Sequence, residues 1–161
     1  MIGQRAFVGL GANLGDAAAT VLAAVQALGG LPQTSLAACS ALYKSAPRDA
    51  SGPDYINAVA ELHTTLAPLV LLHHLQTIED QHGRARPYRH APRTLDLDLL
   101  LYGDVLLNTP QLSLPHPRLH LRAFVLRPLA ELSPQLMVPG LGQIGPWLMN
   151  VADQRVEVLR P

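Results

Sequence analysis

The stretch RTLDLDLL, residues 93–100, constrains the fold more than any other part of the chain. Apolar and acidic side chains alternate through it, and LLY follows. Period-two alternation indicates a β-strand, because successive side chains of a strand point to opposite faces of a sheet. The segment therefore predicts a strand that runs to about Tyr102, with leucines on the core face and carboxylates on the other. The alternating residues are Leu95, Asp96, Leu97, Asp98 and Leu99.

The two acids of this strand require an explanation, because like charges on one face of an apolar strand repel each other. An exposed strand face is the ordinary explanation of an Asp-X-Asp pattern. The apolar neighbours favour a compensating cation instead. Mg²⁺ takes one or two carboxylates together with waters and substrate phosphates. Asp96 and Asp98 are therefore candidate metal ligands, and carboxylates at this spacing suit two ions that hold a phosphate chain.

The segment before the strand, RARPYRHAPR at 84–93, contains four arginines and two prolines and predicts an exposed loop. A solvated basic loop is the alternative. Guanidinium groups bind phosphate through paired donors, and next to an acidic metal pair a loop able to close over a polyphosphate is favoured. The arginines are Arg84, Arg86, Arg89 and Arg93.

The order of elements follows from hydrophobic periodicity and turn residues. It is β-α-β-β-α-β, which predicts an α+β fold: a ferredoxin-like sandwich with an antiparallel sheet and helices on one face. Many functions use this fold, so function must be inferred from the site. The expected segments are a strand at 5–12, a helix at 17–30, strands at 34–46 and 54–64, a helix at 66–83 and the strand ending near Tyr102.

C-terminal additions are expected after this core. The segment 114–132 begins as a loop and then predicts a helix in which Pro128 is a kink or a break. The tail predicts a short helix near 141–150 and a strand near 155–159.

Size and charge limit the function classes. A chain of 161 residues with 48% hydrophobic content suits a single domain over 1–161. The formal net charge of +0 provides no overall field for nucleic acid or membranes. The lone Cys39 suits a reducing compartment, and neither a signal peptide nor a membrane-spanning run is evident. We expect a cytoplasmic monomer with small-molecule substrates.

Three further segments are candidate site elements. Tyr55 and Asn57 are expected on one strand face, where an amide can read a heteroaromatic edge and a phenol ring can stack on it; sheet packing is an equal alternative. His116 lies between two prolines and could contact a phosphate or a ribose, although a structural role is more common. GLGANLG does not match G-x-G-x-x-G, so a turn and close-packing segment is favoured over the alternative of a phosphate cradle.

Together these segments resemble the 6-hydroxymethyl-7,8-dihydropterin pyrophosphokinase family from about residue 5 to 139. The matching blocks, in order, are GLGANLGD, SALYKSAP, PDYINAVAEL, IEDQHGRAR, APRTLDLDLLLYGD and LPHPRLHLRAFVLRPL. The combination of PRTLDLDLL with a downstream PHPR is highly specific. The resemblance implies transfer of pyrophosphate from ATP to the hydroxymethyl group of the dihydropterin, with release of AMP, in folate biosynthesis.

The resemblance also implies a role for individual residues. It places two Mg²⁺ ions on Asp96 and Asp98, between the carboxylates and the ATP phosphates. Arg84 and Arg93 would bind phosphate and stabilise the transition state, and Arg86 would help to close the loop. The residues implied at ATP are Gln76, Glu79, His116 and Arg122. The residues implied at the pterin are Ser45, Ala46, Tyr55, Asn57 and Phe124.

Three positions depart from the family pattern, namely His90 in the closing loop, Gln111, and Pro117 beside His116. Two other function classes are alternatives. A non-catalytic small-molecule-binding module explains the pterin-like face but not the acid pair beside an arginine loop. An RNA-binding sheet domain usually displays several aromatic residues and a basic surface, whereas this chain has 4% aromatic residues and no net charge.

Overall fold

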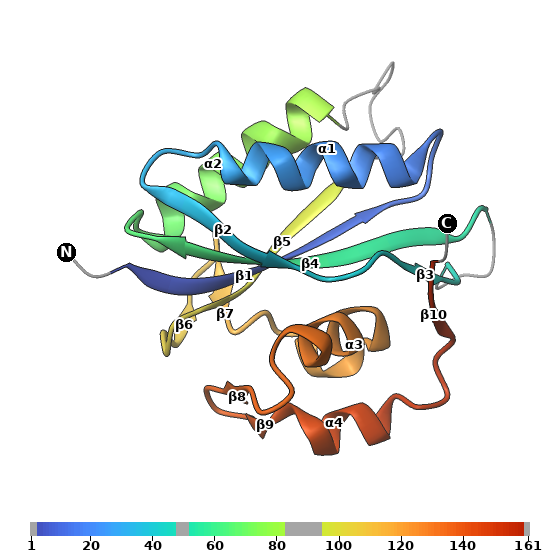
Figure 1. The fold of residues 1–161 in the computed structure, drawn as a ribbon. Helices are drawn as coiled ribbons and strands as arrows, with labels where there is room; N and C mark the ends of the chain where they lie inside the picture. The colour runs from blue at the N-terminus through green and yellow to red at the C-terminus, as the bar shows by residue number, and fades with distance from the viewer. Residues whose placement is uncertain (1–2, 48–51, 83–94, 160–161) are drawn as a thin grey trace.

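The computed structural model describes residues 3–47, 52–82 and 95–159 (Figure 1). The arginine-rich loop lies outside these ranges. Its predicted functional residues Arg84, Arg86 and Arg93, together with Arg89 and His90, are therefore outside the described residues.

An antiparallel sheet forms the centre of the molecule, with the strand order β10-β3-β4-β1-β5, and β2 also pairs with β4. The order of the core strands is that of the predicted ferredoxin-like sandwich, and the fold class is confirmed. The strands are β1 (Gln4–Ala12), β2 (Thr34–Cys39), β3 (Tyr43–Ser45), β4 (Tyr55–Thr64), β5 (Asp96–Tyr102) and β10 (Val156–Val158).

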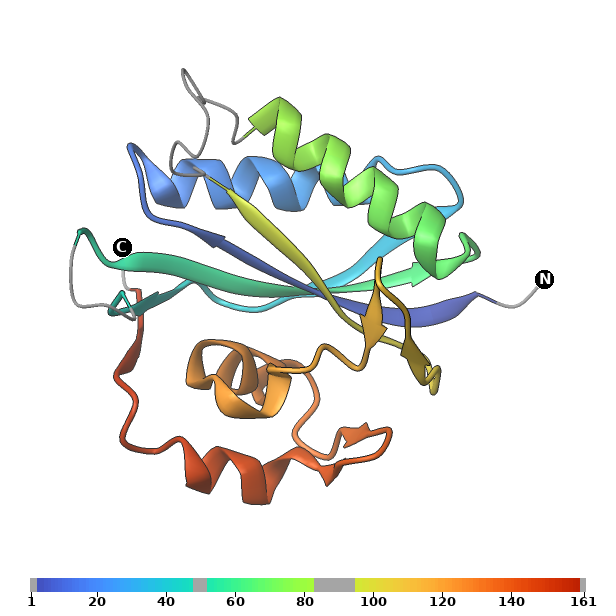
Figure 2. The same ribbon diagram turned by 180° about the vertical axis from the view of Figure 1, so that it is seen from behind.

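Helices cover both faces of the sheet (Figures 1 and 2). On one face lie α1 (Ala17–Gly29) and α2 (Pro68–His82), as predicted, and Asp16 caps α1 by accepting a hydrogen bond from the Ala19 N–H at 3.1 Å. On the other face lies α3 (Ala123–Leu132), and α4 (Ile144–Asn150) packs against α3 on the side away from the sheet. Pro128 lies inside α3, which continues to Leu132 without a break.

The prediction of one continuous strand over 34–46 is wrong, because residues 40–42 separate β2 from β3. The physical reason is Ser40. Its hydroxyl accepts a hydrogen bond from the Val59 N–H at 3.0 Å and donates one to the Ala41 carbonyl at 2.8 Å. A side chain therefore replaces a backbone partner of β4 at this point, and the ladder is interrupted.

Small elements that the sequence did not predict complete the chain. Within the described residues, two hairpins and one 3₁₀ turn connect the larger elements, and β6–β7 lies beside β5. They are β6 (Leu107–Asn108), β7 (Ser113–Leu114), η1 (Leu119–Leu121), β8 (Met137–Val138) and β9 (Gly142–Gln143).

The two faces of β5 enter two separate hydrophobic clusters. Leu95, Leu97 and Leu99 pack under α1 and α2, as the alternation predicted. Leu100 and Leu101 both pack on the α3 side, because the register with β1 shifts between Phe7 and Val8. Asp96 and Asp98 therefore point to the α3 side, beyond the edge of that second cluster. Within the described ranges, no helix is both long and apolar enough to cross a membrane.

Candidate active site

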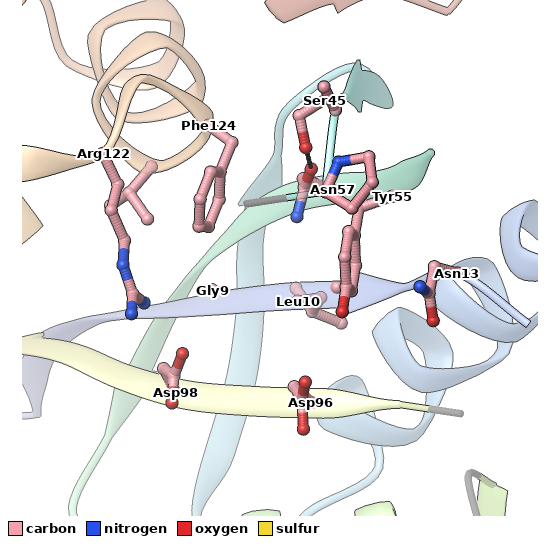
Figure 3. A pocket seen from close by; sticks show the side chains of 15 residues that line it. Gly9, Leu10, Asn13, Ser45, Tyr55, Asn57, Asp96, Asp98, Arg122 and Phe124 are labelled. Atoms are coloured by element: carbon pink, nitrogen blue, oxygen red, sulfur yellow. Dashed lines mark hydrogen bonds between the residues drawn. The ribbon is translucent and has the colours of Figure 1, made fainter. Parts of the chain in front are cut away.

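A cavity of about 500 Å³ opens between the sheet and the beginning of α3 (Figure 3). The structure brings eight of the predicted site residues together around it, from four different segments. They are Ser45, Ala46, Tyr55, Asn57, Asp96, Asp98, Arg122 and Phe124.

Two glycines of β1 form the floor of this cavity. Gly11 pairs with Asn57 on one side and with Asp96 on the other, and Gly9 lies between Val59 and Asp98. A Cβ added to Gly11 would lie 3.0 Å from Nδ2 of Asn57. The glycines therefore leave the space between the amide and the carboxylates open. The close-packing interpretation of this segment is confirmed by Gly9 and Gly11 within the strand, and the turn follows at Gly15, whose φ is 61°.

Asn57 is buried at the back of the cavity, and the hydroxyl of Ser45 donates a hydrogen bond to its Oδ1 at 2.6 Å. The amide nitrogen is left directed toward the open side, as Figure 3 shows. In the same view the rings of Tyr55 and Phe124 stand on either side of Asn57. The arrangement combines a polar amide edge with two aromatic faces, which suits a flat polar heterocycle.

The two carboxylates lie side by side on β5 at the opposite wall of the cavity, and Figure 3 shows Arg122 reaching toward Asp98. The side chain of Asp98 is 45% exposed, so an ionised carboxylate is well solvated there. Among the described residues no cluster of three or more His, Cys, Asp or Glu could hold a metal by itself. A carboxylate pair that leaves most coordination positions to a ligand and to water is the donor set that Mg²⁺ accepts.

His116 lies on the far side of Asp98, with its Nε2 4.0 Å from Oδ1 of that carboxylate. Its Nδ1 accepts a hydrogen bond from the Arg118 N–H at 3.1 Å. Burial lowers the pKa of His116; nearby Asp98 raises it, and Arg122 and Arg118 lower it. A neutral ring with Nδ1 as acceptor carries its proton on Nε2, so His116 presents an N–H donor on the Asp98 side.

A second hollow of about 250 Å³ begins at this histidine and extends along the β6–β7 hairpin. Asp98 lines both hollows, and two of the positions that depart from the family pattern, Gln111 and Pro117, line the second. The other lining residues are Leu72, Leu97, Leu99, Thr109, Pro110, Leu112, Ser113 and His116.

Two predicted nucleotide contacts lie elsewhere on α2. Gln76 is exposed and lines neither hollow. Glu79 accepts a hydrogen bond from the Leu97 N–H at 2.8 Å, between the two aspartates. Since β5 is the last strand of the sheet order, Glu79 supplies a partner to the outer edge of that strand.

Known proteins provide an independent comparison. The sequence model of 7,8-dihydro-6-hydroxymethylpterin-pyrophosphokinase (HPPK) matches residues 7–134. The chain belongs to the HPPK family. The resemblance inferred from the sequence is thereby confirmed, and with it pyrophosphoryl transfer from ATP to hydroxymethyldihydropterin in folate biosynthesis.

Individual HPPK relatives agree. The chain is 50% identical over 137 residues to the 2-amino-4-hydroxy-6-hydroxymethyldihydropteridine pyrophosphokinase of Pseudomonas aeruginosa, covering 84% of this chain and 85% of the relative. It is 41% identical over 157 residues to the enzyme of the same name from Haemophilus influenzae, covering 97% and 98%.

Solved structures show the same fold at low sequence identity. The crystal structure of wild-type Plasmodium falciparum HPPK-DHPS with pteroate superposes with a TM-score of 0.75 at 14% identity, covering 94% of this chain and 43% of that one. A crystal structure of HPPK-DHPS in complex with substrates gives a TM-score of 0.73 at 11% identity, covering 95% and 44%.

Proposed function

We propose that the pyrophosphoryl group passes from ATP to the pterin hydroxymethyl group at the carboxylates of β5. The observation that supports this is the position of Asp98, which lines both hollows. One hollow offers aromatic faces and an amide, and the other begins at His116. Substrates in these two hollows would bring a phosphate chain across the aspartates.

The pterin is assigned to the larger hollow. Asn57 would hydrogen-bond the heterocycle edge through its free amide N–H, while Ser45 holds the other end of the amide. Main-chain groups around Ser45 and Ala46 would complete the edge. Tyr55 and Phe124 would hold the two faces of the ring, and stacking of this kind contributes about 0.5–1.5 kcal/mol beyond surface burial.

ATP is assigned to the second hollow, with its phosphates directed toward the larger one. His116 would donate from Nε2, and Arg122 would add a guanidinium on the pterin side of Asp98. Gln76 and Arg86 remain proposed contacts of the nucleotide and its loop, and Arg84 and Arg93 are proposed to bind the phosphates. The departures Gln111 and Pro117 lie in this hollow, so they would alter nucleotide affinity rather than the reaction.

Asp96 and Asp98 fit two Mg²⁺ ions, because they present carboxylate oxygens on one strand face with room beside them for phosphate and water. When bound, the ions would neutralise phosphate charge and orient the chain for displacement. The residues of the protein position the hydroxyl oxygen and the phosphate chain, and Arg122 adds fixed positive charge in the same space.

The reaction forms one bond and breaks one. The hydroxymethyl oxygen bonds to the β-phosphorus, the bond between that phosphorus and the oxygen bridging to the α-phosphorus breaks, and AMP leaves with the bridging oxygen. The hydroxyl loses its proton. Among the described residues of the cavity the carboxylates are Asp96 and Asp98, so one of them or water is the acceptor.

A product assay tests this proposal. With Mg²⁺, ATP labelled at the β-phosphate and the hydroxymethyl dihydropterin, we expect AMP and a labelled pterin. Formation of ADP would contradict the mechanism. Binding of the pterin by calorimetry with no AMP formed would instead support a non-catalytic binding module.

We propose further that residues 1–161 act as one domain, as a monomer in the cytoplasm. A sedimentation experiment at working concentration, with and without substrates, tests the oligomeric state.

A further inference from the structure

The C-terminal tail makes a specific contact with the beginning of α3. Oε1 of Gln154 accepts a hydrogen bond from the Ala123 N–H at 2.8 Å, and its Nε2 donates to the Leu121 carbonyl at 2.9 Å. The two backbone groups belong to the residues on either side of Arg122. One side chain from the tail thus holds the backbone around the arginine that reaches into the cavity.

This contact replaces a missing helix cap. Arg122 occupies the N-cap position of α3 and makes no capping hydrogen bond with its side chain. Helices usually begin with Ser, Thr, Asp or Asn, whose oxygen satisfies a free N–H of the first turn. An arginine cannot do this, because a guanidinium has no acceptor. Gln154 supplies the acceptor instead.

The position of Gln154 is itself determined by two neighbouring contacts. Its backbone N–H donates to the Val151 carbonyl at 3.0 Å, at the end of α4. Two residues later Val156 pairs with Ser45 in the sheet, and its carbonyl accepts from Nη1 of Arg127 at 2.6 Å. The tail is therefore held on both sides of Gln154. These contacts keep its side-chain amide against the beginning of α3.

We infer that Gln154 is a positioning residue that places Arg122 and Phe124, in the first turn of α3, for substrate binding. This inference rests on the proposed function of those two residues. Gln154 lies beyond residues 7–134, which the HPPK sequence model matches. Gln154 lines neither of the two hollows assigned to the substrates, and its side chain hydrogen-bonds the backbone at the beginning of α3, so we assign its effect to that backbone.

The test compares Gln154→Ala with Asp153→Ala, a substitution of the preceding exposed residue, each in the full chain. Amide hydrogen exchange is measured at Ala123, and kcat and KM are measured for ATP and the pterin. Loss of a cap of this kind corresponds to about a fivefold change in an equilibrium constant. We expect exchange at Ala123 to rise about fivefold or more, and kcat/KM to fall by a similar factor, in Gln154→Ala alone.

A double-mutant cycle with Arg122→Ala separates positioning from general destabilisation. If Gln154 acts through Arg122, most of its effect on kcat/KM disappears in the Arg122→Ala background. The same fold-loss in both backgrounds, or unchanged exchange at Ala123, would overturn the inference.

Failure of the proposed function has a different signature. In that case Arg122→Ala and Phe124→Ala would each leave kcat and KM for both substrates unchanged. Exchange at Ala123 would then still report whether Gln154 caps α3, since it does not depend on turnover.

Discussion

The hydroxyl of Ser45 donates to Oδ1 of Asn57 at 2.6 Å, and this hydrogen bond orients a buried amide at the back of the cavity. The two residues lie on neighbouring strands, where Ser45 pairs with Tyr55, two residues before Asn57. With its oxygen held, the amide can present only its N–H groups to a ligand.

Ser45→Ala should therefore weaken pterin binding. The amide would lose its restraint, at a cost of about 0.5–1.5 kcal/mol, or roughly two- to thirteenfold in the KM for the pterin. The KM for ATP should change little. Ser35→Ala, on the exposed part of β2, is the matched control. Equal pterin KM values for the two variants would contradict the orienting role of Ser45.

Gly11→Ala should reduce pterin affinity by occupying the floor of the cavity. The new Cβ would lie 3.0 Å from Nδ2 of Asn57, so the amide must shift. Overpacking of this kind typically costs about 1–3 kcal/mol. Calorimetric titration with the pterin measures the loss. Gly30→Ala, whose Cβ would meet its nearest atom at 3.6 Å, is the control and should bind normally.

Asp96→Asn and Asp98→Asn test the proposed metal ligands while keeping side-chain size. Removal of one preorganised electrostatic group typically costs about 10²–10³ in kcat, and we expect at least that loss in each variant. Circular dichroism and thermal unfolding should show an intact fold, because both side chains line the cavity rather than the core. If either variant turns over as fast as the unchanged protein, the substituted aspartate is not a metal ligand.

Glu79→Gln and Glu79→Ala distinguish two roles for this residue on α2. If Glu79 serves the edge of β5, Gln should retain the acceptor for the Leu97 N–H and preserve turnover. Ala should lower the free energy of unfolding by about 1–3 kcal/mol, because the N–H of Leu97 loses this partner. Urea denaturation measures the difference. A raised KM for ATP in Glu79→Gln, without loss of stability, would support direct nucleotide contact instead.

Tyr43 should titrate only at strongly alkaline pH. Burial, reinforced by its hydrogen bond to Glu131, raises the pKa of Tyr43 to about 12. The folded protein then holds this proton more tightly than the unfolded chain does. The associated stability is present below pH 10 and is lost as the pH rises toward 12. The difference in phenolate absorbance between the unchanged protein and Tyr43→Phe should show one group near pH 12, and one near pH 10 would contradict the expectation.

Local patterns were sufficient for most of the core. The alternation of Leu95, Leu97 and Leu99 with two aspartates predicted both faces of β5, since side-chain direction in a strand depends only on position. The shared face of Tyr55 and Asn57 followed in the same way. The short helix and final strand of the tail also lie close to their predicted positions, over Ile144–Asn150 and Val156–Val158.

Long-range contacts decided the rest. The interruption at Ser40 depends on a hydrogen bond with Val59, 19 residues away. The shift that turns Leu100 and Leu101 to the same side depends on the register with β1. The contacts of Glu79 with β5 and of Gln154 with α3 join segments that approach only when the sheet is complete.

The sequence by itself determined which side of their strands the candidate site residues Asp96, Asp98, Tyr55 and Asn57 occupy, because side-chain direction in a strand follows a period of two. Only the tertiary structure decided how those residues are held. Their supports are hydrogen bonds made by side chains of other segments, and such pairing leaves no periodic trace in the chain.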